Sequence, residues 1–415
     1  MQEAGEQAPL DSPGGLERRM SRRRMGMKSL SVTPTKIPVS KSDAPVSPTT
    51  LRRRSVNALW PVAAGHTKRG GAPMLADHDD RGTNGAPRTI LKKLCEQEYA
   101  AYKRIWSDTQ ADPIRRFVPG YSGVEDDLLI AGKKEKYLRL DNLLQHYKAP
   151  MKVMDVKLGI RTFLEKECKN KELRNDLFLR MQEMYPWEVT DEDCEKQAVT
   201  KHKWMTVRDK NSTISALGYR IDGIGGYNDV DKEKDIDDKL VEIRTERETE
   251  GTFREFVKES AIGPGCDSRR TAECVLEKLQ LFRKALAESK FTREHEFIGT
   301  SILIVIDHKG DNGIYWIDFG KTIPNETGAD MTHLKPWVMG NHEDGILIGV
   351  DKMIAVWTDV VQSFPPSFES NGNHSSFVRS ITPAGKEESE ERSNGILHAL
   401  RHRVSFCSRS PCALM

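Results

Sequence analysis

The chain has 415 residues, and its 64 Lys and Arg nearly balance 62 Asp and Glu, which gives a formal net charge of +2. Its 7 cysteines are scattered and include no CxxC pair, which argues against a zinc ribbon and against a disulfide framework. No apolar run approaches the roughly 18 residues of a membrane span, and the N-terminal stretch lacks the residue order of a signal peptide. We therefore expect a cytoplasmic protein.

The two ends of the chain differ in composition from its middle. Residues 1–60 are rich in Ser, Pro, Gly and Arg and poor in aromatic residues, and residues 363–415 show a similar bias. Such segments bury too little apolar surface to offset the entropy of ordering them, so we predict that both are disordered. The basic N-terminal arm lacks an aromatic stacking platform, which argues against nucleic-acid binding. Its positive charge is compatible with a weak contact with an anionic membrane surface.

The first predicted elements form a small lobe over residues 61–148. RTILKKL (88–94) is typical of a strand, and EQEYAAYKRIWSDT (96–109) is typical of a helix. The apolar runs DDLLIAG (126–132) and KYLRLDNLL (136–144) flank a GKKEK turn, and this pattern predicts a β-hairpin.

A second lobe is predicted over residues 149–362, with a helical insert at 160–215. In chain order its predicted elements are a strand at 151–159, helical stretches at 161–185 and 191–210, a strand at 216–226, helices at 253–259 and 274–289, strands at 297–308 and 313–322, and a helix at 345–362.

The strand VMDVKLGIRT (153–162) carries an acid and a base two residues apart. Side chains alternate along a strand, so Asp155 and Lys157 share one face while Met154 and Val156 share the apolar one. Two interpretations are open at this point. The strand is either half-buried with an ion pair on its polar face, or it is an active-site strand that meets a charged substrate.

The strand GIYWIDFGKT (313–322) repeats this logic, because Asp318 ends an apolar run just before a glycine that lets the backbone turn. Mg²⁺ is usually held by one or two carboxylates together with substrate phosphates, which suits Asp318. Together the strands predict a phosphoryl-transfer site. In it Asp318 holds Mg²⁺ on ATP, Asp155 orients or deprotonates the attacking hydroxyl, and Lys157 neutralises the moving phosphoryl group. Lys92 in TILKK would contact the ATP phosphates.

Six segments, in chain order, resemble the inositol polyphosphate kinases and most closely the inositol-1,4,5-trisphosphate 3-kinases. They are VMDVKLGIRTFLEKE, AVTKHKWMTVRD, ALGYRIDGI, IGTSILIVIDH, IDFGKT and HLKPWVMGNHEDGILIGVD. The resemblance runs from about Gly65 to about Val361. It implies an α/β (α+β), two-lobed, protein-kinase-like fold with ATP between the lobes and a helical insert that forms the inositol-phosphate pocket.

The resemblance also implies a reaction and a set of site residues. The reaction is ATP- and Mg²⁺-dependent phosphorylation of the 3-hydroxyl of inositol 1,4,5-trisphosphate. The implied residues are Asp155 and Lys157 for catalysis; Asp318 and Ser301 for the metal; Lys92, Asp318 and the hinge Asp141, Asn142 and Leu143 for ATP; and Lys157, Arg174, Lys201, Trp204 and Arg208 for the inositol phosphate. Guanidinium and ammonium groups suit several phosphates that converge in one cavity.

The chain departs from the family pattern in four places. Met151 stands where the family has a proline, Trp204 replaces an aromatic hydroxyl, and Gly225 and Gly226 stand where a lysine pair is common. The stretch GHTKRGG (65–71) differs from the family's glycine-rich pattern. We therefore expect weaker substrate binding and an intact reaction.

Two alternatives remain beside the trisphosphate 3-kinase. One is a broader inositol polyphosphate multikinase, against which the large helical insert argues. The other is a non-catalytic inositol-phosphate-binding scaffold, against which the retained Asp155, Lys157 and Asp318 argue. Residues 45–65 carry basic residues before Val56, Leu59 and Trp60, a pattern compatible with either a calmodulin-binding helix or a basic linker.

Overall fold

The computed structural model describes residues 56–58, 74–77, 87–107, 111–130, 133–226, 239–259, 263–326, 328 and 330–366. All of them belong to the second of two units, Met1–Arg52 and Arg53–Met415. The segments predicted to be disordered, and the stretch GHTKRGG, lie outside the described residues except at 56–58 and 363–366, so the domain bounds stay predictions. Within the described part, no helix has both the length and the apolar character to cross a membrane.

The first sheet has five antiparallel strands in the order β1-β2-β3-β5-β4. The predicted hairpin is confirmed as the pair β4 and β5, and the predicted strand at 88–94 and helix at 96–109 are confirmed as β3 and α1. The bounds are β1 (Val56–Ala58), β2 (Leu75–Asp77), β3 (Thr89–Lys93), α1 (Glu96–Ser107), the 3₁₀ turn η1 (Pro113–Phe117), β4 (Tyr121–Ile130) and β5 (Lys133–Asp141). The sequence patterns did not reveal β1 and β2.

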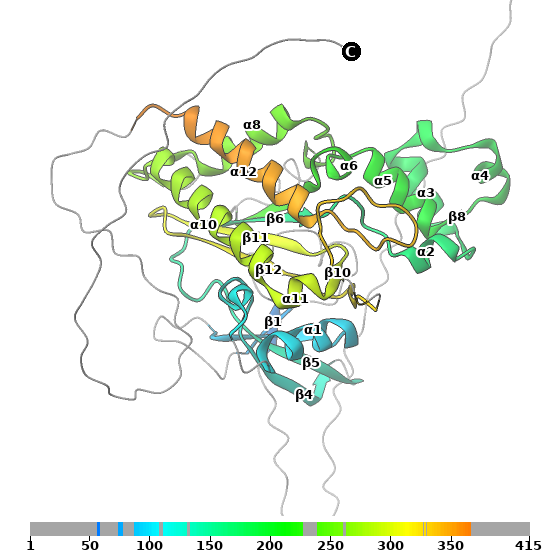
Figure 1. The fold of residues 1–415 in the computed structure, drawn as a ribbon, viewed down its shortest axis with the longest axis horizontal. Coiled ribbons are helices and arrows are strands. Elements are labelled where there is room, and N and C mark those ends of the chain that lie inside the picture. The colour runs from blue at the N-terminus through cyan, green and yellow to red at the C-terminus, as the bar shows by residue number, and fades with distance from the viewer. Residues whose placement is uncertain are drawn as a thin grey trace, which may run out of the picture. The chain divides into compact units, whose positions relative to one another are not determined.

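The second sheet has four antiparallel strands in the order β12-β11-β6-β9. Three long helices lie along one face of it (Figure 1), and the apolar side chains of the strands, such as Met154 and Trp316, join the core under these helices. Alternation then leaves the polar side chains of β6 on the opposite face. The bounds are β6 (Met151–Leu158), β9 (Tyr219–Gly225), β11 (Ser301–Asp307), β12 (Asn312–Ile317), α8 (Glu246–Val257), α10 (Ser268–Glu288) and α12 (Ile346–Gln362).

The insert between β6 and β9 is helical, as predicted, but its two long helical stretches are broken into short elements. Pro186 begins a 3₁₀ turn, and Thr190 and Thr200 cap new helices by accepting backbone N–H groups. The elements are α2 (Glu165–Lys169), β7 (Leu173–Arg174), α3 (Asn175–Met184), η2 (Pro186–Glu188), α4 (Asp191–Lys196), β8 (Val199–Thr200), α5 (Lys201–Lys210) and α6 (Ile214–Leu217). The insert has its own small apolar core around Phe178 and Met181.

The predicted strand at 297–308 is divided in two. Gly299, with φ of 72°, separates β10 (His295–Phe297) from β11, and β10 pairs with β13 (Thr322–Pro324) beside the short α11 (Lys290–Arg293). Arg161, at the start of the insert, is buried, and its Nη2 lies 2.7 Å from Glu296 Oε1 of β10. This arginine therefore ties the insert to the second lobe.

Candidate active site

Strand β6 presents Asp155 and Lys157 on the face that the three long helices leave open. The register places Lys157 opposite Ser301 of β11 and opposite Arg220 of β9. Lys157 Nζ donates a hydrogen bond to Ser301 Oγ over 2.8 Å. The interpretation of VMDVKLGIRT as a strand with one charged face is therefore confirmed in its geometry, and Gly159, with φ of 100°, makes the turn out of it.

Asp318 joins this pair from the end of β12. Its carboxylate Oδ2 lies 3.3 Å from Lys157 Nζ. The backbone turn occurs at Asp318 itself, which has φ of 68°, whereas we had expected the turn at the following glycine, Gly320. A left-handed conformation is uncommon for residues other than glycine and is more tolerable for Asp than for most. Such strain persists only where the surroundings hold it, and it clusters at functional sites.

Lys92 of β3 reaches the same carboxylate from the first sheet. Its Nζ lies 2.8 Å from Asp318 Oδ1 and 2.7 Å from Glu98 Oε1 of α1. Burial alone would lower the pKa of Lys92, but the charges of Asp318 and Glu98 raise it well above its ordinary value. Glu98 was not predicted from the sequence. An acid in the first turn of the helix that directly follows the lysine strand is the signal that could have found it.

The electrostatics of β6 suit proton transfer. Oδ1 of Asp155 is buried and accepts no hydrogen bond within the described part of the chain. Burial raises the pKa of the Asp155 carboxyl to about 6, although the charge of Lys157 opposes the shift. Burial would lower the pKa of Lys157, but the carboxylates of Asp155 and Asp318 raise it. The site thus pairs a carboxylate of raised proton affinity with a lysine that stays charged.

Two predicted phosphate ligands approach this site from the insert. Arg208 of α5 donates from Nη2 to Asp222 Oδ1 of β9 over 3.1 Å. Lys201 forms an ion pair with Glu167, which also lies 3.2 Å from Lys321 Nζ. Lys321 follows Asp318 by three residues and was not predicted; its place in IDFGKT is the signal that was available.

The structure does not bring Arg174 and Trp204 to the catalytic strands. Arg174 is exposed and forms two hydrogen bonds of 2.7 Å with Asp176. Trp204 packs against the core of the insert, with its ring 6.0 Å from that of Tyr185. Their roles as substrate ligands stay predictions.

The predicted hinge follows β5. Asn142 is 5% exposed, and its side chain donates to Pro87 O over 2.7 Å and accepts from Leu144 N over 3.1 Å. The Asp141 backbone N–H donates to Gly120 O, and Leu143 packs on an apolar cluster of the second sheet. The Asn142 side chain therefore fixes the connection between the two sheets, and contact of this segment with adenine stays a prediction.

Gly226 has a structural reason for lacking a side chain. Its φ is 97°, and a Cβ would lie 2.1 Å from the carbonyl oxygen of Met151. A lysine cannot replace it without a shift of the β6 backbone. The departure from the family's lysine pair is therefore tied to the close approach of these two strand ends.

The oxygen donors of the site fit a hard divalent cation. Asp318 contributes a carboxylate, and Ser301 contributes a buried hydroxyl. The described residues contain no group of three or more His, Cys, Asp or Glu that could hold a metal. A small set of ligands is what Mg²⁺ needs when substrate phosphates complete its coordination.

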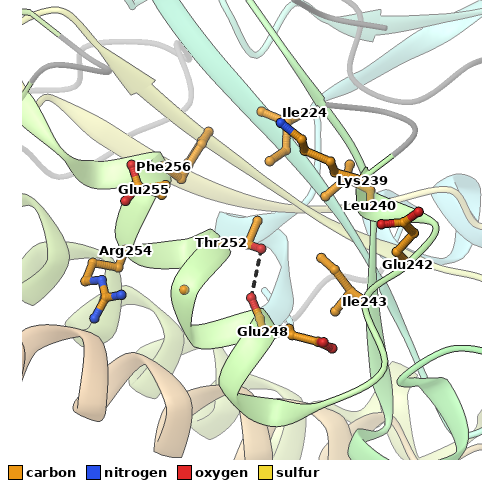
Figure 2. A pocket seen from close by; sticks show the side chains of 11 residues that line it. Ile224, Lys239, Leu240, Glu242, Ile243, Glu248, Thr252, Arg254, Glu255 and Phe256 are labelled. Atoms are coloured by element: carbon orange, nitrogen blue, oxygen red, sulfur yellow. Dashed lines mark hydrogen bonds between the residues drawn. The ribbon is translucent and has the colours of Figure 1, made fainter. Parts of the chain in front are cut away.

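A separate pocket of about 520 Å³ lies beside α8, away from these residues. Figure 2 shows its apolar floor, with Ile224, Ile243 and Phe256, and its charged rim. None of the predicted site residues lines this pocket. The candidate active site is therefore the polar face of β6, β9 and β11 together with Asp318 and Lys92.

Comparison with known proteins identifies relatives of the chain. Human inositol-trisphosphate 3-kinase A is 35% identical over 308 residues, which cover 73% of this chain and 59% of that protein. The inositol-trisphosphate 3-kinase homolog of Caenorhabditis elegans is 33% identical over 287 residues, which cover 68% of this chain and 54% of that protein. The chain therefore spans less than two thirds of the length of these curated relatives.

Solved structures give a more distant likeness. An inositol phosphate multikinase of S. cerevisiae, in complex with ADP and Mn²⁺, has a TM-score of 0.42 and 18% identity over 66% of this chain and 98% of that chain. The inositol polyphosphate kinase family model matches residues 137–358, which is more than half of the chain. This match agrees with the resemblance of the motifs. The protein belongs to the inositol polyphosphate kinase family.

Proposed function

We propose that the protein is an ATP- and Mg²⁺-dependent kinase that phosphorylates the 3-hydroxyl of inositol 1,4,5-trisphosphate to give the 1,3,4,5-tetrakisphosphate. The observation that carries the proposal is that Lys92 and Lys157 both contact the carboxylate of Asp318, over 2.8 and 3.3 Å, on the sheet that carries Asp155. The curated relatives named above are described as inositol-trisphosphate 3-kinases, which supports the choice of acceptor.

In the proposed reaction the acceptor hydroxyl attacks the terminal phosphorus of ATP, and the bond from that phosphorus to the bridging oxygen breaks. Asp155 takes the hydroxyl proton. Its raised pKa supports this role, as does its Oδ1, which accepts no hydrogen bond in the described structure. Lys157 neutralises charge on the moving group, and Lys92 holds the ATP phosphates in line. Asp318 and Ser301 would hold Mg²⁺, which when bound offsets the negative charge of the phosphates.

The acceptor pocket needs several cations for several phosphates. Lys201 and Lys321 share the single carboxylate of Glu167, so this corner carries excess positive charge. Arg208 adds a planar guanidinium that can bind a phosphate through two N–H groups. These side chains of the insert and of IDFGKT support a polyphosphorylated acceptor.

The test is an assay of the purified protein with labelled ATP and a panel of inositol phosphates. We expect the trisphosphate to be converted to the tetrakisphosphate, with little use of tetrakis- and hexakisphosphates. Lys157→Ala and Asp318→Asn should abolish turnover. Lys93→Ala is the matched control, because this lysine lies next to Lys92 but pairs with Glu135 at an exposed position. Normal turnover by either site variant would refute the assignment, and equal use of all acceptors would favour the multikinase.

A further inference from the structure

Strand β9 contains a β-bulge at Asp222. Gly223 lies opposite Asp155 and Ile221 lies opposite Val156, so Asp222 is an extra residue between two paired positions. In a regular strand Ile221 and Ile224, three residues apart, would face opposite sides. Both are instead buried, at 3% and 7% exposure, in the core under the long helices. A bulge of this kind redirects a side chain, and bulges occur often beside active sites.

Asp222 faces the polar side of the sheet, as Arg220 two residues before it does, and the bulge returns the following Ile224 to the core. Its Oδ1 accepts from Arg208 Nη2 over 3.1 Å and from Arg220 Nε over 3.0 Å. Burial would raise the pKa of the Asp222 carboxyl, but the charges of Arg220 and Arg208 hold it below its ordinary value. Asp222 is therefore a partly buried anion that joins helix α5 of the insert to the sheet that carries Lys157.

We propose that Asp222 is a positioning residue that holds Arg208 in the orientation in which this arginine binds a phosphate of the acceptor. The inference rests on the proposed function, because it assigns Arg208 to the acceptor. An arginine side chain loses rotamer entropy when it is fixed. A carboxylate that fixes it before the acceptor arrives removes part of that cost from binding.

The direction in which acceptor binding changes when Asp222 is removed distinguishes a positioning role from a purely electrostatic one. Asp222 is an anion close to the place proposed for a polyanion, so its removal should strengthen acceptor binding if only its charge matters. If it positions Arg208, its removal should weaken binding. The surface pair of Arg174 and Asp176 provides a matched control, since it joins a predicted phosphate-binding arginine to an acid at an exposed site where ion pairs contribute little.

The experiment measures binding of inositol 1,4,5-trisphosphate to the full chain by calorimetry in a double-mutant cycle. Asp222→Ala should weaken binding about 10-fold, as expected for the loss of a hydrogen bond between charged groups. The same change in an Arg208→Ala background should have little further effect. Asp222→Asn keeps the shape and one acceptor oxygen, so it should weaken binding a few-fold and provides a folded variant if alanine prevents folding. Asp176→Ala should leave the affinity within about 2-fold.

Steady-state kinetics supply the second measurement. For the Asp222 variants, the KM for the acceptor should rise, while kcat and the KM for ATP stay within about 2-fold of wild type. Equal or tighter binding by Asp222→Ala or Asp222→Asn, or an undiminished effect without Arg208, would overturn the inference. If the wild type binds the trisphosphate but does not phosphorylate it, the proposed function fails and the binding cycle still decides the role of Asp222. If the wild type binds no inositol phosphate, both proposals are wrong.

Discussion

Glu98 is the carboxylate that fixes Lys92 on the first sheet, and its charge can be removed with little change of shape. The two charged atoms are 2.7 Å apart, and the side chains are 3% exposed for Glu98 and 26% exposed for Lys92. A hydrogen bond between charged groups contributes about 1.5–3 kcal/mol, and the water around Lys92 favours the lower end of this range. We expect Glu98→Gln to lower the free energy of unfolding by about 1.5 kcal/mol.

The same change should weaken the use of ATP. Without the charge of Glu98, Lys92 is drawn toward Asp318, and a loss of about 1.4 kcal/mol in ATP binding corresponds to a tenfold rise in KM. The assays are urea denaturation and steady-state kinetics at varied ATP with saturating acceptor. Glu96→Gln, at an exposed position in the first turn of the same helix, is the control and should change neither value. An unchanged KM for ATP in Glu98→Gln would show that this pair does not position Lys92.

Gly226→Ala should lower the free energy of unfolding by more than about 1 kcal/mol in urea denaturation, because its φ of 97° and the nearby Met151 carbonyl leave no place for a Cβ. His333 Nδ1 lies 2.8 Å from Asp344 Oδ1. Burial would lower the pKa of His333, but the charge of Asp344 raises it. This pair therefore stabilises the fold below the unfolded pKa of about 6.5 and loses its effect as pH rises through the folded pKa. Melting curves should show that the stability difference between wild type and His333→Gln shrinks over that rise. A peptide covering residues 45–65 should bind immobilised calmodulin in Ca²⁺, although 56–58 forms strand β1 in the intact chain, and no binding would refute this.

The regular parts of the fold could be predicted from the sequence. The strand β6, the hairpin of β4 and β5, and helix α12 follow apolar patterns that the structure reproduces within a few residues. The insert could not be predicted in detail, because its short helices depend on local caps such as Thr190 and on the two-residue ladder of β7 and β8. The strands β1 and β2 could not be predicted at all, since each is only three residues long.

The site residues that lie on or directly after a single strand could be predicted from the sequence. Asp155 and Lys157 follow from alternation within β6, and Asp318 follows from the end of β12. Glu98, Asp222 and Lys321 were missed because their importance comes from pairing with side chains on other elements, which lie 6, 14 and 154 residues away in the sequence. Such pairing depends on register and on the approach of the two sheets, which single-sequence patterns do not contain.

The backbone irregularities of the site explain why pattern-based prediction stops where it does. Asp318 adopts a left-handed conformation, and the bulge at Asp222 changes the face to which the following residues of β9 point. Regular alternation would have assigned Ile224 to the polar face, although it is buried in the core. A buried apolar pair at odd spacing, such as Ile221 and Ile224, is therefore a signal that the residues between them are redirected. In this protein that signal leads to Asp222, which links the insert to the catalytic strand.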